Sequence, residues 1–249
     1  MLDVSERRVL GAFRMVSAIT GTSVDSDFVV DPGQLKVVRN RSGVFVVRDA
    51  PGMHALTTKS DVQGVAIPAQ QQFELTVKDD DFVYLPRRFK LTLPRKIAPL
   101  TDPDSVFNAV KVKMYPTPAA PVMPSWAVLR VSVVKAGDPA RTGLPWSVIQ
   151  LTLPKSTLLA LSDARGEALV TAAGLPARSS NGDSSGALTS SEVAVDVTAF
   201  FDPANASKPK DFVPDPDELM ANVGTMKSSK QSIKIAPGRT IKVTIEIAI

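Results

Sequence analysis

The chain has 249 residues, of which 44% are hydrophobic and 22% charged, and its formal net charge is +4. This hydrophobic fraction is too high for a disordered chain, and the length suits one large domain or two small ones. The chain contains no cysteine and one histidine, which excludes disulfides, zinc–thiolate sites, cysteine nucleophiles and histidine-rich metal sites. No apolar run approaches the roughly 18–20 residues of a membrane-spanning helix.

A strand pattern dominates the chain. Short segments rich in Val, Ile, Leu, Thr and Phe alternate with polar residues or run apolar, and Gly, Pro, Asp or Asn bound each one. The predicted strands are residues 35–39, 72–77, 88–93, 110–114, 126–134, 148–153, 193–197, 232–235 and 240–249. Helical periodicity is weak, and one short helix is predicted over 215–223, where acidic residues occupy the first turn. We therefore predict an all-β protein of antiparallel β-sandwiches (Ig-like or transthyretin-like) with at most one short helix.

A proline-rich segment divides the chain into halves. Residues 116–124 contain four prolines, which cannot occupy a central strand because each lacks the N–H that a ladder needs. Such a segment favours a stiff, extended linker. We predict an N-terminal β-sandwich over residues 1–115, a linker over 116–124 and a C-terminal β-sandwich over 125–249.

The two halves repeat one local pattern. Residues 39–47 and 162–170 both read as a strand, a polar turn closed by glycine, and an apolar strand. Gly43 and Gly166 suit these turns because glycine adopts a positive φ without strain. Two interpretations stay open: an internal duplication, or turn chemistry that any two β-sandwiches share.

Basic residues cluster just before the middle of the chain. They are Arg87, Arg88, Lys90, Arg95 and Lys96. Nucleic-acid platforms combine such a cluster with exposed aromatic residues, but the aromatic residues near this cluster fit an alternating strand pattern. The cluster therefore indicates a solvated strand face or a protein-contact patch, and we do not expect a nucleic-acid partner.

The two tryptophans complete the set of candidate partner contacts. Trp126 begins a strand directly after the proline-rich segment, and Trp146 lies at the entry of a strand. Core packing or an interface is the favoured role for both, and a glycan-stacking platform is the alternative.

The remaining polar residues show no catalytic or metal-binding pattern. His54 lacks the G-x-S-x-G serine that hydrolytic catalysis would need, which favours a structural role. The acidic run Asp79–Asp81 is contiguous, whereas calcium loops space their carboxylates at alternate positions, so a solvated turn is favoured. Asp211, Asp215 and Asp217 are interpreted in the same way. We predict no catalytic residue, no metal, no cofactor and no enzymatic activity.

The last predicted strand runs apolar to the final residue. Its expected buried face consists of Ile241, Val243, Ile245, Ile247 and Ile249, and its expected solvent-exposed face of Lys242, Thr244 and Glu246. An uncovered edge strand of this kind promotes aggregation, so we expect a neighbouring strand or a partner to cover it.

The second half resembles the transthyretin-like or carboxypeptidase-regulatory-like sandwich family. The resemblance lies in the strand at 127–133, the hairpin at 161–170 with its D-x-x-G turn, and the P-G hairpin at 235–241. It implies a non-catalytic β-sandwich that serves binding or spacing.

A second resemblance covers the whole chain. The order of residues 37–43, 84–89, 121–131 and the Asp163 hairpin is similar to accessory proteins of contractile phage-tail-like injection systems. This resemblance implies a structural part of a particle, attached to its baseplate, tail or cap.

We therefore expect a non-catalytic structural or adaptor protein of a multi-subunit particle. Its expected partners are other protein subunits, with a homo-oligomer as an open possibility and no membrane insertion. The first residues lack the basic-then-apolar layout of a signal peptide, so we expect synthesis in the cytoplasm and assembly into a particle, retained or released. The alternative is a glycan-binding β-sandwich recognition protein.

Overall fold

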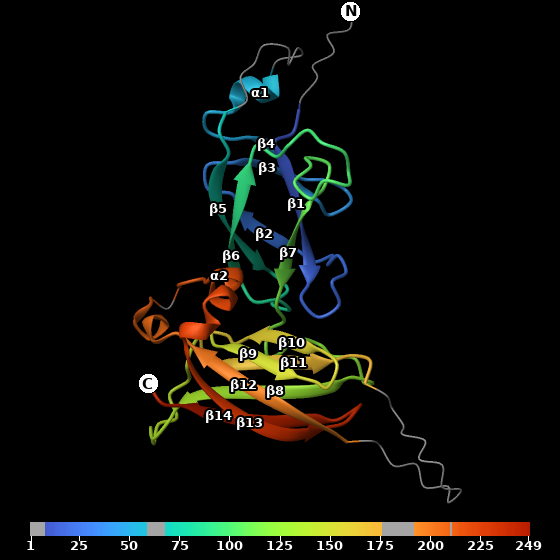
Figure 1. Ribbon diagram of the computed structural model, residues 1–249. Coiled ribbons are helices and arrows are strands. Elements are labelled where there is room, and N and C mark those ends of the chain that lie inside the picture. The colour runs from blue at the N-terminus through green and yellow to red at the C-terminus, as the bar shows by residue number, and fades with distance from the viewer. Residues whose placement is uncertain (1–7, 59–67, 176–191, 210) are drawn as a thin grey trace, which may run out of the picture. The chain divides into compact units, whose positions relative to one another are not determined.

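A computed structural model describes residues 8–58, 68–175, 192–209 and 211–249 (Figure 1). The described residues form mainly β-strands, so the protein is all-β, as the alternation of the sequence predicts. The chain divides into two compact units. Unit 1 comprises Met1–Asp80 and Pro86–Met114, and unit 2 comprises Asp81–Leu85 and Tyr115–Ile249.

Unit 1 contains a four-stranded sheet of order β3-β4-β1-β7 and a three-stranded sheet of order β2-β5-β6. Its strands are β1 (Gly11–Ser17), β2 (Phe28–Asp31), β3 (Lys36–Arg39), β4 (Phe45–Asp49), β5 (Gln71–Asp79), β6 (Arg87–Leu93) and β7 (Val110–Met114). A short helix, α1 (His54–Thr58), follows β4. The sequence pattern did not predict α1, because five residues are too few to show a helical period.

Aromatic side chains join the two sheets of unit 1. Phe13 of β1 stacks on Phe45 of β4, with ring centroids 5.2 Å apart and planes at 5°. Phe13 also meets Phe89 of the other sheet edge-on, at 5.2 Å. Alternate residues of β1 point inward and are buried because side chains alternate between the faces of a strand.

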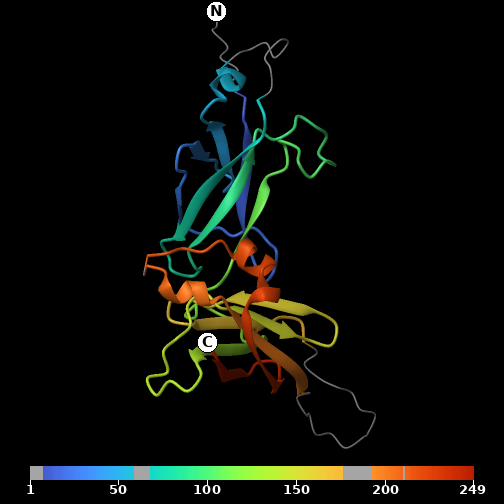
Figure 2. The same ribbon diagram turned by 60° about the vertical axis from the view of Figure 1, so that its left-hand side comes forward.

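Unit 2 also contains two sheets, of order β11-β8-β14 and β10-β9-β12-β13. Figures 1 and 2 show these strands from two sides. The strands are β8 (Ala127–Lys135), β9 (Val148–Thr152), β10 (Thr157–Leu161), β11 (Glu167–Ala172), β12 (Val193–Phe201), β13 (Lys227–Ile235) and β14 (Thr240–Ile247). One apolar core spans both sheets and includes Leu129, Val131, Ile149, Leu151 and Val197, each of them fully buried.

The helices of unit 2 lie between β12 and β13. They are the 3-10 helices η1 (Pro203–Ser207) and η2 (Val223–Thr225) and the α-helix α2 (Pro216–Ala221). The predicted helix over 215–223 corresponds to α2 and the start of η2. Asp215 caps α2, since its side chain accepts a hydrogen bond of 3.0 Å from the backbone N–H of Asp217.

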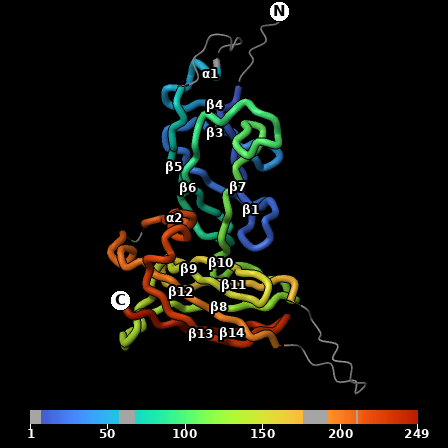
Figure 3. Tube along the Cα trace, viewed as in Figure 1, coloured from blue at the N-terminus to red at the C-terminus, as the bar shows by residue number. Residues whose placement is uncertain are grey.

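Each unit also contains one parallel strand pair, which the antiparallel pattern did not predict. In unit 1, β7 runs parallel to β1, and in unit 2, β14 runs parallel to β8. Figure 3 shows β1 and β7 side by side although they are far apart in the sequence. The alternation of side chains is the same in both kinds of ladder, so the sequence pattern cannot tell them apart.

The two units share a strand order. In both, the first strand lies between the fourth strand and the parallel last strand, as β4-β1-β7 and β11-β8-β14. In both, the fifth strand lies between the second and the sixth, as β2-β5-β6 and β9-β12-β13. The third strand differs, because β3 pairs with β4 whereas β10 pairs with β9.

The repeated turns also bond alike. The side chain of Asn40 accepts hydrogen bonds from the backbone N–H groups two and four residues later, both at 2.9 Å. Asp163 accepts the equivalent bonds at 2.8 and 3.0 Å. Gly43 and Gly166 donate to the carbonyl oxygens of Asn40 and Asp163, both at 3.1 Å. The shared strand order and the shared bonds favour the duplication.

The proline-rich segment belongs to unit 2. Ala120 is 4% exposed and packs with Val128 and Leu169. Pro116 forms a β-bridge with Tyr84, so the short segment 81–85 joins unit 2 beside the proline-rich segment. Ala120 and Val122 of the segment therefore pack against the C-terminal sandwich, whereas Pro121, Met123 and Pro124 are exposed.

The strand β14 lies at the edge of its sheet. Val243, Ile245 and Ile247 are buried in the core, as the alternation predicts, whereas Ile249 is 45% exposed. Because β14 pairs with β8 over its whole length, β8 covers one of its two edges.

Candidate partner-binding surfaces

The predicted basic cluster does not form one surface. Arg87 is 1% exposed, and its Nη1 donates to the carbonyl oxygen of Lys113 at 2.7 Å. This bond joins β6 to β7, the edge strands of the two sheets of unit 1. The burial of Arg87 corrects its prediction as a partner contact, because a buried guanidinium cannot reach a partner.

The other members of the cluster lie on two different parts of unit 1. Arg88 pairs with Glu74 of β5 at 3.1 Å, and Lys90 is exposed on β6. Arg95 and Lys96 follow β6, and both form ion pairs with Asp104, at 4.0 and 3.6 Å. The structure therefore separates residues that the sequence places close together.

Residues 95–109 form a loop, here named the 95–109 loop, whose polar side chains bond inward. Ser105 is fully buried, and its hydroxyl donates to the carbonyl oxygen of Ala98 at 2.6 Å. The amide of Asn108 donates to the carbonyl oxygen of Leu100, also at 2.6 Å. These bonds link residues of the loop that lie seven and eight positions apart in the sequence.

The same loop presents large apolar side chains to solvent. Ile97 is 71% exposed, Leu100 67% and Phe107 66%. Single exposed apolar residues are common on protein surfaces, and three on one internally bonded loop make it a candidate interaction surface. The individual side chains gave no sequence signal, because their exposure depends on the inward bonds of their polar neighbours.

A second candidate surface lies on the outer face of the β3-β4-β1-β7 sheet. Val38, Val46 and Ala12 stand opposite one another across β3, β4 and β1, so they share this face. Arg48 lies two residues beyond Val46, and Arg14 lies two residues beyond Ala12, which places both on the same face.

The strand β7 adds further cations to this face. Lys111 stands directly opposite Arg14, and Lys113 lies two residues further along β7. Arg41, in the turn between β3 and β4, lines a hollow beside Val46 and Arg48. We name Arg14, Arg41, Arg48, Lys111 and Lys113 the basic face. Among the residues that the structure describes, none of the five forms an ion pair.

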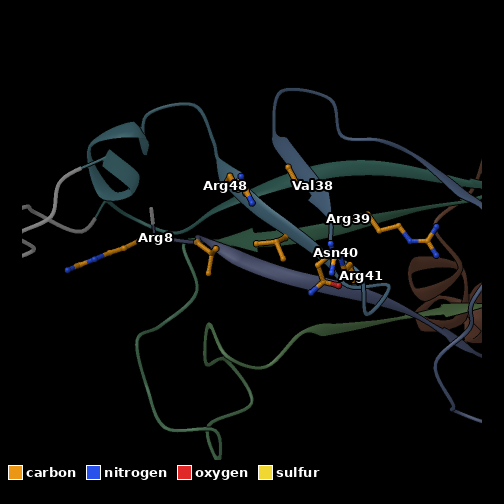
Figure 4. A pocket seen from close by; sticks show the side chains of 8 residues that line it. Arg8, Val38, Arg39, Asn40, Arg41 and Arg48 are labelled. Carbon is orange, nitrogen blue, oxygen red and sulfur yellow. The ribbon is translucent and has the colours of Figure 1, made fainter. Parts of the chain in front are cut away.

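The hollow on this sheet has a volume of about 490 Å³. Figure 4 shows Arg8, Arg41 and Arg48 around it, with Val38 on its β3 side, whereas the guanidinium of Arg39 points away from them. Arg39 is satisfied elsewhere, since its Nη2 lies 3.3 Å from a carboxylate oxygen of Asp25 and its guanidinium lies over the ring of Phe45.

The tryptophans do not form a sugar platform. Trp146 is 6% exposed, so its ring has no open face. Trp126 is half-buried and packs against the small cluster of Ala120, Val128 and Leu169. Both placements fit the packing role that the sequence favoured, but the burial of Trp146 corrects its prediction as a partner contact.

His54 and the predicted acidic groups take structural positions. His54 begins α1, and its Nδ1 lies 3.2 Å from Oδ2 of Asp49. Burial alone would raise the pKa of Asp49, but hydrogen bonds from Lys36 and His54 outweigh it and lower the pKa below its ordinary value. Asp79 is 5% exposed and accepts a bond of 2.6 Å from the hydroxyl of Ser26, so this member of the acidic run is not solvated.

Within the described ranges, no three His, Asp or Glu side chains gather as they would around a metal ion. No helix of the described chain is long and apolar enough to cross a bilayer. Comparisons with protein-family models, with curated proteins and with solved structures found no match.

Proposed function

We propose that the chain is a non-catalytic structural or adaptor protein that docks into a multi-subunit particle. The observation that carries the proposal is the 95–109 loop, which is bonded internally and exposes Ile97, Leu100 and Phe107. Covering one such side chain completely stabilises a contact by about 1.5–3 kcal/mol. A loop that is already ordered loses little conformational entropy when a partner covers it.

The kind of particle is proposed from the resemblance of the motif order to accessory proteins of contractile phage-tail-like injection systems. In this proposal the chain attaches to the baseplate, tail or cap, and its partners are protein subunits of the same assembly. Synthesis in the cytoplasm and later assembly belong to the same proposal.

The test is the size at which the chain sediments. Lysate of the source cells, expressing their particle genes, is run through a density gradient, and the fractions are probed for this chain. We expect the chain to co-migrate with megadalton particles. Sedimentation at the size of a monomer or small oligomer would overturn the particle proposal and make glycan-array binding the next measurement.

A pair of double variants tests the loop itself. Ile97→Ser with Phe107→Ser removes two exposed apolar side chains from the loop, and Val29→Ser with Phe82→Ser removes two from elsewhere, which are 51% and 80% exposed. We expect the first pair to leave the particle fractions and the second to stay in them. If both pairs stay, the 95–109 loop does not carry the attachment.

A further inference from the structure

The basic face places like charges directly opposite each other. Arg14 and Lys111 are register partners on β1 and β7, and no carboxylate lies among the described residues of this face. Like charges directly opposite across a ladder destabilise a sheet. Negative charge that covers the face would therefore offset the repulsion between these two side chains.

Other cations of unit 1 show that the chain has acidic partners for its basic residues. Lys36 pairs with Asp49 at 3.2 Å, Arg88 with Glu74 at 3.1 Å, and the Lys96–Asp104 distance is 3.6 Å. The basic face differs because none of its five cations forms an ion pair with a described residue. The Nε of Arg14 is buried without a hydrogen-bond partner among the described residues, so the chain leaves this guanidinium only partly satisfied.

The centre of the face is apolar. Val38 is 41% exposed, and its register partner Val46 and the next residue across, Ala12, are half-buried. Along the strands, this row lies between Arg48 at one end and Arg14 and Arg41 at the other, where the β3–β4 turn lies. A partner that covers the whole face must therefore bring both negative charge and apolar groups.

We propose that the basic face binds an acidic polypeptide surface that also carries apolar side chains. Arg41 and Arg48 can each bind a carboxylate or a phosphate in a two-bonded geometry, so it is the apolar centre of the face that favours a polypeptide partner. A nucleic-acid backbone would neutralise the cations but leave the apolar strip of Val38, Val46 and Ala12 uncovered. The described residues of the face also include no aromatic side chain for base stacking. The proposal does not rest on the 95–109 loop or on membership of a particle.

Binding of fluorescein-labelled poly-L-glutamate, followed by fluorescence anisotropy of the full chain, tests the charge. A second labelled peptide, in which leucine replaces every third glutamate, tests the apolar strip. We expect both to bind, the leucine-containing peptide more tightly, and the affinity for poly-L-glutamate to fall as salt is added. Equal affinities for the two peptides would overturn the role of the strip.

Matched double variants separate this face from the net charge of the protein. Arg48→Glu with Lys111→Glu reverses two charges on the face, and Lys78→Glu with Lys155→Glu reverses two exposed lysines elsewhere. We expect the first pair to weaken binding by about tenfold or more and the second by less than about twofold. Equal losses would mean that net charge alone drives binding, and no loss would exclude the face.

Competing classes of partner are outcomes of the same assay. Tighter binding of a labelled oligothymidylate, or of vesicles containing phosphatidylserine, than of the leucine-containing peptide would overturn the proposal. If the glutamate variants fail to fold by circular dichroism, Arg48→Gln with Lys111→Gln replaces them with the same expectation of weaker binding.

Discussion

The two equivalent turns differ in the space around their glycines, and this difference allows a quantitative prediction. Gly43 and Gly166 have φ values of +74° and +80°, so alanine is strained at either position. A Cβ added at Gly43 would meet nothing within 4 Å. A Cβ added at Gly166 would lie 2.5 Å from the carbonyl oxygen of Val133 and 2.7 Å from the backbone nitrogen of Leu144.

The expected costs follow from these contacts. Gly43→Ala should destabilise unit 1 by about 1–2 kcal/mol, the cost of a left-handed conformation for an L-residue. Gly166→Ala should add to this strain an overpacking cost of about 1–3 kcal/mol, because the clashing atoms belong to the backbone and cannot rotate away. Those atoms are also held by the bonds from Val133 to Gly166 and from Leu144 to Val133, both 2.8 Å long.

Scanning calorimetry of the full chain measures the difference. At about 4 °C per kcal/mol, we expect Gly43→Ala to lower its transition by about 4–8 °C and Gly166→Ala by roughly twice as much. Gly137→Ala is the control within unit 2, since its φ is +69° and nothing lies within 4 Å of the added Cβ. If Gly166→Ala costs no more than Gly137→Ala, the close approach of the two backbone segments at this turn is wrong.

Three further predictions concern charge and the last strand. Lys111→Glu should raise the stability of unit 1 by about 0.5 kcal/mol in denaturant unfolding, because it replaces a repulsion with Arg14 by an attraction. The control variant Lys78→Glu should not raise it. A loss of stability in Lys111→Glu would contradict the register of β1 and β7. The ionised carboxylate of Asp49 has a pKa below its ordinary value, so its stabilisation is present above that ordinary value and is lost as the pH falls through the lowered one. Asp49→Asn should therefore reduce the dependence of the unfolding free energy on pH in the acid range, and an unchanged dependence would refute this. Deletion of residues 241–249 removes nearly all of β14 with its buried side chains, each of which contributes about 1.5–3 kcal/mol to the stability of unit 2. The deletion should therefore unfold unit 2 or make it insoluble. An unchanged melting curve would show that β14 is dispensable.

Some features of the candidate surfaces could be read from the sequence and others could not. The pattern identified Arg88, Lys90 and Lys96 as polar positions on or after a strand. It could not show that Arg87 turns inward, because the carbonyl oxygen that holds it belongs to Lys113 on another strand. The exposure of Ile97 depends in the same way on bonds made by its neighbours.

Edge strands show the same limit of sequence patterns. The strand β13 (Lys227–Ile235) begins five residues before the predicted segment at 232, because its first half is polar and lacks apolar alternation. It forms a strand because β12 pairs with it over its whole length. Backbone hydrogen bonds need no particular side chain, so a polar edge strand leaves little trace in composition.

The sequence by itself determined the class of fold and the glycine-closed turns, since alternation, strand propensity and positive φ are local properties. The tertiary structure alone decided which strands became neighbours. The alternation of apolar and polar residues predicts which residues share a face of one strand, but strand pairing decides which of these faces join into one surface. The basic face exists because β7 pairs with β1 and brings Lys111 opposite Arg14, two residues that nothing in the linear order connects.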